Sequence, residues 1–230
     1  MIVTDCSFQI GAVRPEDFPR DGLPQIAFMG RSNVGKSSLI NRLLGSRGLA
    51  RVSKTPGRTR AINFFRVNER IYFVDLPGYG YARVPAPLRR EWKGLVEAYL
   101  EGEGRPDLAI QLVDVRHDPT GLDLELLEWL RLREIPHRVV MTKADKLSRA
   151  RQTRALSHGA ERLGLLPGGG VSLVSAMTGE GIPELWRSID GACAARRWPS
   201  RTVSRPEGGG TSDTHHAARA LAAGRITETQ

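Results

Sequence analysis

Short apolar runs alternate with stretches of helical periodicity along most of the chain. The runs rich in β-branched and aromatic residues predict strands, and the stretches between them predict amphipathic helices. In one such stretch Leu122, Leu126 and Leu130 recur at helical spacing and so share one face. This alternation is typical of a mainly parallel sheet that is covered by helices on both faces. The predicted strands are Ile26–Met29, Ile62–Val67, Ile71–Asp75, Leu108–Val113, Arg138–Met141 and Val171–Val174.

Two of these strands are too close in the sequence to be parallel neighbours. Only Asn68-Glu69-Arg70 separates Ile62–Val67 from Ile71–Asp75, whereas a parallel crossover needs about a dozen residues or more. The two runs therefore predict an antiparallel hairpin. The expected fold class is α/β, with a six-stranded, mostly parallel sheet and one antiparallel strand at its edge.

The composition of the chain changes at Pro199. From there to Gln230 it is rich in Gly, Ser, Thr and Ala and contains no aromatic residue. Such a segment buries too little apolar surface to offset the entropy of ordering it. We therefore expect one folded domain over residues 1–198 and a disordered, glycine-rich, basic tail over residues 199–230.

Length and cysteine content exclude several classes of protein. A chain of 230 residues can bury a core without disulfides or a structural metal. Cys6 and Cys193 form no CxxC pair, which argues against a disulfide scaffold and a zinc finger. The N-terminus lacks the pattern of a secretory signal, and no apolar run reaches the roughly 20 residues of a membrane-spanning helix. These features predict a cytoplasmic protein without a membrane partner, and we expect a monomer.

The charge of the chain points to a polyanionic partner. Lys and Arg number 34 against 25 Asp and Glu, so the net charge is +9, and the sequence pI is about 10.2. A positive field of this size attracts nucleic acid at long range. Ordinary solvated surface charge is the alternative interpretation. The same two interpretations, contact with RNA or solvated charge, apply to Arg83, Arg89 and Arg90.

The strongest motif is a glycine-rich loop of the form GxxxxGK[ST], between a predicted strand and a predicted helix. In such a loop the backbone N–H groups and the helix N-terminus hold phosphates, the lysine reaches the β- and γ-phosphates, and the following hydroxyl can bind Mg²⁺. The loop consists of Gly30, Arg31, Ser32, Asn33, Val34, Gly35, Lys36 and Ser37.

A second motif lies at the end of the strand Ile71–Asp75. It comprises Asp75, Leu76, Pro77 and Gly78. Asp75 can hold Mg²⁺ through a water molecule, and the Gly78 N–H can face a γ-phosphate. Alone, this sequence is also a good turn. Its place at a strand end after a phosphate loop favours the functional interpretation.

Two further strand ends carry residues suited to guanine. Thr142, Lys143, Ala144 and Asp145 follow one strand, and Val174, Ser175 and Ala176 follow the last. The Asp145 carboxylate can accept two hydrogen bonds from guanine N1–H and N2–H₂, the Lys143 stem can cover the purine, and the backbone amides at Val174–Ala176 can meet O6. Open α/β sheets bind ligands at the carboxyl ends of their strands, where all these motifs meet.

Six segments together resemble the EngB family of bacterial GTPases, which belongs to the Era-like class of G proteins. The resemblance covers roughly residues 5–197 and is carried by GRSNVGKSSLIN, SKTPGRTR, DLPGYGYARV, LVDVRHDPTGLD, MTKADKLSR and VSAMTGEGIPELW. It implies a Ras-like P-loop GTPase that binds and hydrolyses GTP with Mg²⁺. It also implies a role in assembly of the large (50S) ribosomal subunit, with ribosomal RNA and proteins as partners, and a need for the protein in normal cell division and septation.

The resemblance also implies a switch segment made of Gly57, Arg58, Thr59, Arg60 and Ala61. Thr59 would be the second protein ligand to Mg²⁺ beside Ser37. Spacing alone does not choose between Thr59 and Thr55.

Three positions depart from the wider G-protein pattern. Thr142 stands where many G proteins have Asn, which removes one amide that braces the phosphate loop. Tyr79 follows DLPG where Ras-like enzymes carry a water-orienting Gln, so the catalytic group stays unassigned and hydrolysis should be slow without an activator. Asn33 either helps to hold K⁺ near the phosphates or braces the loop.

Two other functions stay open on the sequence alone. One is a GTP-dependent regulatory protein of the division machinery that does not contact RNA. The other is an ATP-using kinase or transporter ATPase, which the TKAD sequence of residues 142–145 disfavours.

Overall fold

The structure is a computed structural model that describes residues 1–195 except 47, 51–60, 80–85, 103 and 166–169. The chain divides into a unit over Met1–Arg197 and a second over Trp198–Gln230. Residues 199–230, predicted to form a disordered tail, lie outside the described residues, so that assignment stays a prediction. Within them, no helix combines the length and apolar character needed to cross a membrane.

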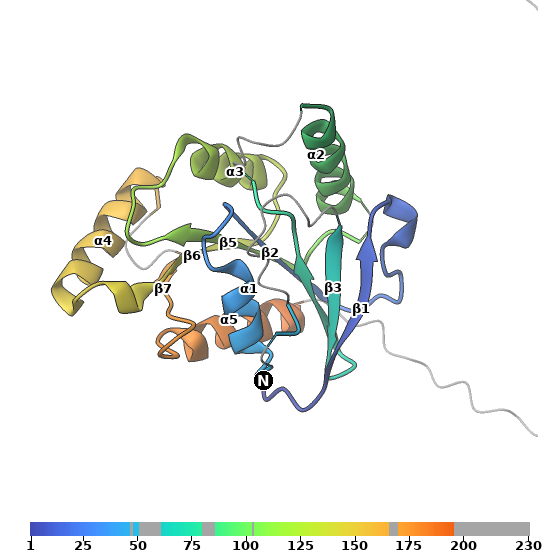
Figure 1. Cartoon of the computed structure of the whole chain (residues 1–230), viewed down its shortest axis with the longest axis horizontal. Helices are drawn as coiled ribbons and strands as arrows, with labels where there is room; N and C mark the ends of the chain where they lie inside the picture. Colours follow the sequence, from blue (N-terminus) through green and yellow to red (C-terminus); the bar gives the residue numbers. More distant parts are fainter. Residues whose placement is uncertain (47, 51–60, 80–85, 103, 166–169, 196–230) are drawn as a thin grey trace, which may run out of the picture. The chain divides into compact units, whose positions relative to one another are not determined.

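Seven strands form one sheet in the order β1-β3-β4-β2-β5-β6-β7 (Figure 1). Their pairings are parallel except for β1 with β3 and β3 with β4. The strands are β1 Cys6–Ala12, β2 Gln25–Gly30, β3 Ile62–Val67, β4 Ile71–Asp75, β5 Leu108–Asp114, β6 His137–Thr142 and β7 Val171–Leu173.

Helices cover both faces of this sheet because its central strands are buried on both sides. In β2, Ile26 and Phe28 face one hydrophobic cluster and Ala27 and Met29 face another. The first cluster includes residues of α1 and α5, and the second includes residues of α2 and α3, which lie above the sheet in Figure 1. The α-helices are α1 Lys36–Leu43, α2 Ala86–Glu101, α3 Gly121–Leu132, α4 Arg149–Arg162 and α5 Ile182–Ala195, and two short 3-10 turns are Pro15–Asp17 and Ala144–Lys146.

The predicted α/β class and the hairpin of β3 and β4 are confirmed. Asn68 and Glu69, in the turn between the two strands, have positive φ angles of 51° and 53°. The Asn68 side chain also accepts hydrogen bonds from the backbone N–H groups of Thr4 and Asp5. This turn therefore anchors the segment that leads into β1.

The predicted number of strands and the predicted edge are wrong. The sheet has seven strands rather than six, and the antiparallel strand β3 is second from the edge because β1 pairs along its outer side. The sequence Cys6–Ala12 contains no continuous apolar run, and most of its residues stay partly or fully exposed. Its pairing comes from the tertiary register with β3 rather than from a hydrophobic pattern of its own.

Candidate functional site

Four loops meet at the carboxyl ends of the parallel strands. The glycine-rich loop follows β2, the segment from Leu76 follows β4, and residues 143–145 follow β6. Residues 174–176 follow β7, and the backbone N–H of Ala144 donates to the carbonyl of Val174 at 3.2 Å. Segments from distant parts of the sequence thus lie at one edge of the sheet.

The backbone of the glycine-rich loop has a conformation that few residues adopt. Gly35 caps α1 with a φ of 104°, in the left-handed region where a side chain is strained. A Cβ on Gly30 would lie 2.8 Å from Cγ1 of Val34 and 2.9 Å from the carbonyl oxygen of Leu112. Both glycines are therefore required by the local geometry.

This loop presents backbone donors to a ligand. The described hydrogen bonds give no acceptor to the N–H groups of Asn33, Gly35, Lys36 and Ser37. The last two belong to the first turn of α1, whose amides have no partner within the helix. A set of N–H groups at a helix N-terminus is suited to an anion such as a phosphate.

Lys36 forms an ion pair with Asp75, which brings the glycine-rich loop and the end of β4 together. The two side chains are only 12% and 7% exposed, respectively. Beyond Asp75 the chain runs beside the loop, because the Tyr79 N–H donates to the Gly30 carbonyl and the Ser32 N–H donates to the Tyr79 carbonyl. The lysine and the carboxylate are thus held at the same point.

The Tyr79 hydroxyl is directed toward α3. It donates a 2.8 Å hydrogen bond to Oδ1 of Asp123, a carboxylate that is only 2% exposed. The other oxygen of Asp123 accepts hydrogen bonds from the N–H and the hydroxyl of Thr120, at the start of α3. Burial first, and the Asp123 charge next, raise the pKa of Tyr79 far above its usual range. This phenol therefore stays protonated and bound to α3.

The segment after β6 braces the glycine-rich loop at two points. The hydroxyl of Thr142 donates to the carbonyl of Val34 at 2.6 Å, and Nζ of Lys143 donates to the carbonyl of Asn33 at 2.7 Å. Thr142 lacks the side-chain amide that braces this loop in many G proteins, but its hydroxyl still supplies a hydrogen bond to the loop. Lys143 also has a positive φ of 63°, which turns the chain sharply after the strand.

Asp114, the last residue of β5, holds Lys143 from the other side. Its Oδ2 accepts a 2.7 Å hydrogen bond from Nζ of Lys143, and both its oxygens accept bonds from Arg116, at 2.9 and 2.7 Å. Partial burial alone would raise the pKa of Asp114, but the hydrogen bonds from Arg116 and Lys143 outweigh it and hold the pKa well below its usual range. The carboxylate is therefore ionised and fixes the lysine.

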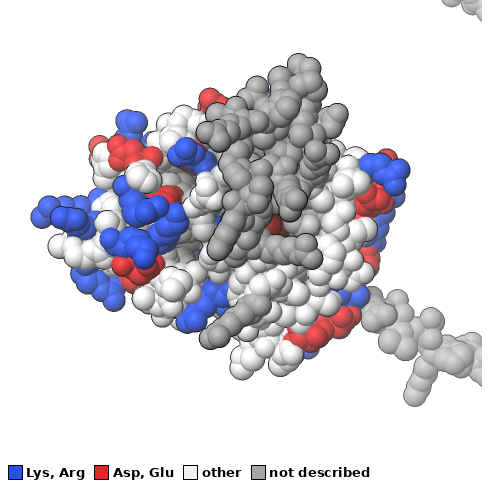
Figure 2. Space-filling model, viewed as in Figure 1, with Lys and Arg blue, Asp and Glu red and all other residues white. Residues whose placement is uncertain are grey.

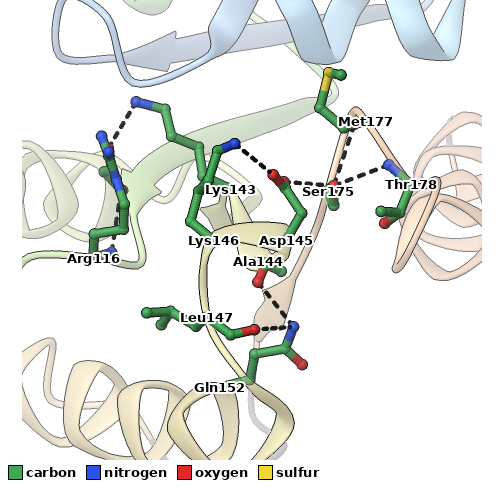
Figure 3. A network of polar contacts seen from close by, with 11 residues as sticks. Arg116, Lys143, Ala144, Asp145, Lys146, Leu147, Gln152, Ser175, Met177 and Thr178 are labelled. Atoms are coloured by element: carbon green, nitrogen blue, oxygen red, sulfur yellow. Dashed lines mark hydrogen bonds and ion pairs between the residues drawn. The ribbon is translucent and has the colours of Figure 1, made fainter.

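Asp145 is oriented by the loop after β7 (Figure 3). Its Oδ1 accepts a 2.7 Å hydrogen bond from the hydroxyl of Ser175, which itself accepts the N–H groups of Met177 and Thr178. The Ser175 hydrogen bond is the main cause that lowers the pKa of Asp145. Gln152 of α4 steadies the same turn by donating to the carbonyl of Ala144 at 2.9 Å.

The three backbone amides of residues 174–176 are not equivalent. The Val174 N–H donates to the carbonyl of Met141, and the Ser175 N–H donates to the carbonyl of Glu180. Among the described hydrogen bonds, the N–H of Ala176 has no acceptor. Ala176 is therefore the residue of the three that can donate to a ligand.

Comparison with known proteins decides the family. A family model described as a 50S ribosome-binding GTPase matches residues 25–143. A probable GTP-binding protein EngB from Geobacter sulfurreducens is 45% identical over 198 residues, which cover 86% of this chain and 96% of that protein. The chain belongs to the EngB family of GTPases. It binds GTP and hydrolyses it to GDP and phosphate.

Other relatives and solved structures agree with this assignment. The EngB protein of Solibacter usitatus is 46% identical over 193 residues, which cover 82% of this chain and 96% of that one. A crystal structure of a probable GTP-binding protein EngB superposes with a TM-score of 0.64 at 28% identity and covers 75% of this chain and 100% of that chain. Era of Aquifex aeolicus, bound to GDP and AlF4⁻, gives a TM-score of 0.59 at 25% identity, over 73% of this chain and 56% of that one. Because the chain belongs to a family of GTPases, the alternative of an ATP-using kinase or transporter ATPase is excluded.

Not every residue singled out in the sequence can be placed. Gly57–Arg60, which include Thr59 and follow Thr55, lie outside the described residues, while Ala61 directly precedes β3. The side chains of Arg83, Arg89 and Arg90 lie outside them too.

Two residues that the sequence analysis overlooked contact this EngB-type site, namely Asp114 and Asp123. Asp114 ends an apolar strand just as Asp75 does, and that parallel was a usable signal. Nothing local marks Asp123, because Thr120 and Asp123 together look only like a helix start.

Proposed function

We propose that this protein is a GTP-dependent switch in assembly of the large ribosomal subunit, and that the cell needs it for normal division and septation. The observation that carries the proposal is the match of residues 25–143 to the model described as a 50S ribosome-binding GTPase. The net charge of +9 supports the proposal. The nucleotide site binds one small anion, so the remaining positive charge is available to attract a larger anion such as ribosomal RNA.

In this proposal the glycine-rich loop holds the phosphates of GTP. The N–H groups of Asn33, Gly35, Lys36 and Ser37 that lack an acceptor donate to phosphate oxygens. Lys36 exchanges its ion pair with Asp75 for the β- and γ-phosphates, and the Gly78 N–H meets the γ-phosphate. The remaining residues of the loop, Gly30, Arg31, Ser32 and Val34, set the course of the backbone.

The oxygen ligands present suit Mg²⁺, which prefers hard oxygen donors and keeps several waters. The Ser37 hydroxyl adjoins Lys36, and the Asp75 carboxylate is paired with that same lysine, so both donors lie at one place. Ser37 would bind the ion directly, Asp75 through water, and Thr59 as a further ligand. The ion supplies charge neutralisation for the phosphates. K⁺ near Asn33 remains part of the proposal as an accessory cation.

Guanine would lie between residues 142–145 and the loop after β7. Asp145, oriented by Ser175, accepts from N1–H and N2–H₂, and the Ala176 N–H donates to O6. The stem of Lys143 covers the purine while its ammonium stays bound to Asn33 and Asp114. An adenine amino group would face the Ala176 donor with another donor, so the pocket favours guanine.

Tyr79, the residue that follows Asp75–Gly78, does not supply a base for the hydrolytic step. Tyr79 is bound to Asp123, and its raised pKa makes it a poor proton acceptor. We propose that attacking water is oriented by a group that the ribosomal partner supplies or orders. Hydrolysis by the isolated protein is then slow.

Co-sedimentation with purified large-subunit particles tests the proposal. The protein is loaded with a non-hydrolysable GTP analogue or with GDP, and binding is measured at several KCl concentrations. We expect tighter binding in the GTP form by about 1–3 kcal/mol, the usual size of such coupling. Binding should also weaken steeply with salt because phosphate contacts release counterions.

Each failure of this experiment has a distinct meaning. Equal binding in both nucleotide states would remove the switch from the proposal. Salt-independent binding would remove the RNA. Absence of binding to any large-subunit particle would favour the alternative regulatory role in the division machinery without RNA contact.

A further inference from the structure

A basic groove runs between α4 and the loop that links β5 to α3. It encloses about 370 Å³ and is lined on the loop side by Val115–Pro119 and on the helix side by Arg151, Arg154 and His158. Met141 of β6 and Gly159 contribute to its lining. We call it the α4 groove. Its volume is within the range of small-ligand sites, about 300–1,000 Å³.

The helix side of the α4 groove is formed by basic residues on one face of α4. Arg151, Arg154 and His158 recur at helical spacing, so their side chains leave α4 on one side. Within the described part of the chain, no carboxylate forms an ion pair or hydrogen bond with Arg151 or Arg154. By contrast, the neighbouring Arg149 is paired with Glu180. Two exposed guanidinium groups therefore remain available to an external anion.

The loop side of the groove carries one arginine and one carboxylate among its lining residues. Arg116 lines the groove, and its bonds to Asp114 hold it in place. The single carboxylate among the lining residues, Asp118, is bound to His158 at 3.1 Å. Because Arg116 is paired with Asp114, the positive charge that stays unpaired in the groove is that of Arg151 and Arg154. Figure 2 shows Lys and Arg gathered over the part of the molecule where Figure 1 places α4.

We propose that the α4 groove binds the phosphodiester backbone of RNA. The planar guanidinium matches two phosphate oxygens at once, and it is less strongly hydrated than an ammonium group, so arginine suits this contact. The chain carries a net charge of +9, which draws in a polyanion before any contact forms. A groove open to solvent and lined by arginines fits a backbone strand better than a compact metabolite.

The α4 groove is also connected to the nucleotide site. Leu147, one of its lining residues, directly follows the turn Ala144–Lys146 that carries Asp145. Arg116 shares Asp114 with Lys143, the residue proposed to cover guanine. RNA in this groove would therefore lie next to the base-binding loop. This assignment rests on the proposed RNA partner and names the surface that receives it.

Binding of a plain RNA duplex tests the groove separately from the ribosome. A fluorescently labelled RNA duplex of about 20 base pairs is titrated at several KCl concentrations with three full-length proteins. These are the wild type, the Arg151→Gln/Arg154→Gln variant and the control Arg70→Gln/Arg105→Gln. Arg70 and Arg105 are also exposed, have no carboxylate partner among the described residues, and precede β4 and β5 at the opposite end of the sheet. Both variants remove two positive charges.

The groove variant should bind RNA about tenfold more weakly at moderate salt, and its salt slope should fall by about two, because each phosphate contact contributes about one. The control should stay within about twofold of the wild type. GDP affinity and melting temperature should be unchanged in both variants. Equal weakening in the two variants would show a bulk charge effect and overturn the proposal, as would no weakening in either.

Two further arms separate the possible explanations. In the first arm, an oligoglutamate of equal charge competes with RNA. If it binds the wild type more tightly than RNA does, displaces the RNA, and binds the groove variant only weakly, the groove would be assigned to an acidic protein and the RNA proposal would be overturned. Large-subunit particles form the second arm. Loss of duplex binding in the groove variant, together with absence of particle binding by the wild type, would uphold the groove and refute the ribosomal function.

Discussion

The carboxylate of Asp145 accepts a 2.7 Å hydrogen bond from the hydroxyl of Ser175, which lies 30 residues later in the chain. The bond joins the loop after β6 to the loop after β7, so each loop sets the position of the other. It is also the main cause that lowers the pKa of Asp145. In the proposed site, guanine would therefore contact both loops.

Asp145→Asn should weaken GTP binding by about 2–4 kcal/mol, the range for losing a charged hydrogen-bond partner. The new amide matches the carbonyl of xanthine, so the variant should gain affinity for xanthosine triphosphate. Calorimetry with both nucleotides measures the exchange. Asp190→Asn, which removes a carboxylate paired with the N-terminus far along α5, is the control and should bind GTP normally. Unchanged GTP affinity in Asp145→Asn would refute the assignment.

Lys36→Ala should abolish tight GDP and GTP binding because the β- and γ-phosphates lose their lysine. A loop lysine is expected from sequence to be exposed and of little value to stability, but Lys36 is 12% exposed and paired with Asp75. The variant leaves that carboxylate unpaired, so the free energy of unfolding should fall by about 1–3 kcal/mol.

A double-mutant cycle separates these two effects of Lys36. Adding Asp75→Asn to Lys36→Ala should restore part of the stability, since the unpaired charge is gone, without restoring nucleotide binding. Lys93→Ala, on the exposed side of α2, is the control and should change neither quantity. Normal GDP binding by a folded Lys36→Ala protein would contradict the role given to this residue.

Tyr79→Phe tests whether the phenol takes part in hydrolysis or holds the segment after β4 against α3. The hydroxyl is bound to Asp123, so its loss leaves one buried carboxylate oxygen without a donor. We expect a loss of about 1–3 kcal/mol in the free energy of unfolding. The single-turnover rate of GTP hydrolysis should change by less than about threefold. A large drop in that rate at unchanged stability would assign the phenol to catalysis.

Truncation after Trp198 should leave GDP affinity and the melting temperature nearly unchanged. The Geobacter sulfurreducens relative is matched over 96% of its own length by 86% of this chain, which leaves about a seventh of the chain unmatched. The composition of residues 199–230 predicts a segment that packs on nothing. A truncation after Ser188 is the contrasting variant, because it removes Ile189 from the core. A large drop in melting temperature on truncation after Trp198 would show that the tail packs on the domain.

Much of the architecture was predictable because the central strands are continuous apolar runs. Ile62–Val67 and Ile71–Asp75 have the predicted bounds, since both lie in the hydrophobic core and are delimited by a polar turn. The strand Cys6–Ala12 escaped prediction, because an edge strand that pairs on one side needs no such run. A continuous apolar run marks a strand that is buried, whereas most residues of Cys6–Ala12 are partly or fully exposed.

The segments proposed to bind phosphate and guanine are contiguous in the sequence, and their positions at strand ends were predictable. The contacts between them were not. Lys36 with Asp75 and Tyr79 with Asp123 join residues about 40 positions apart, and nothing in either local sequence selects the partner. The same holds for the Ala176 amide, which stands out only when the acceptors of Val174 and Ser175 are known.

Asp114→Asn should weaken nucleotide binding although Asp114 is outside the recognised motifs. The carboxylate holds Nζ of Lys143 at 2.7 Å, and a neutral amide would leave that ammonium loosely positioned beside guanine. We expect a loss of about 1–2 kcal/mol in GDP affinity, measured by calorimetry at pH 7. Arg116→Gln is the matched comparison, because it removes the other partner of Asp114 and leaves the bond to Lys143 intact. Its GDP affinity should stay within about twofold of the wild type.

The pH dependence of stability gives Asp114 a second, independent test. Its pKa in the folded protein lies well below the usual range of an aspartate, so the folded state favours the ionised form. The stabilisation is then complete above about pH 4 and is lost as the pH falls through the folded pKa. At pH 7 Asp114→Asn should be less stable than the wild type, and the difference should shrink below about pH 4. Urea titrations between pH 7 and pH 3 measure it. A difference that is constant over this range would show that the ionised carboxylate of Asp114 does not stabilise the fold.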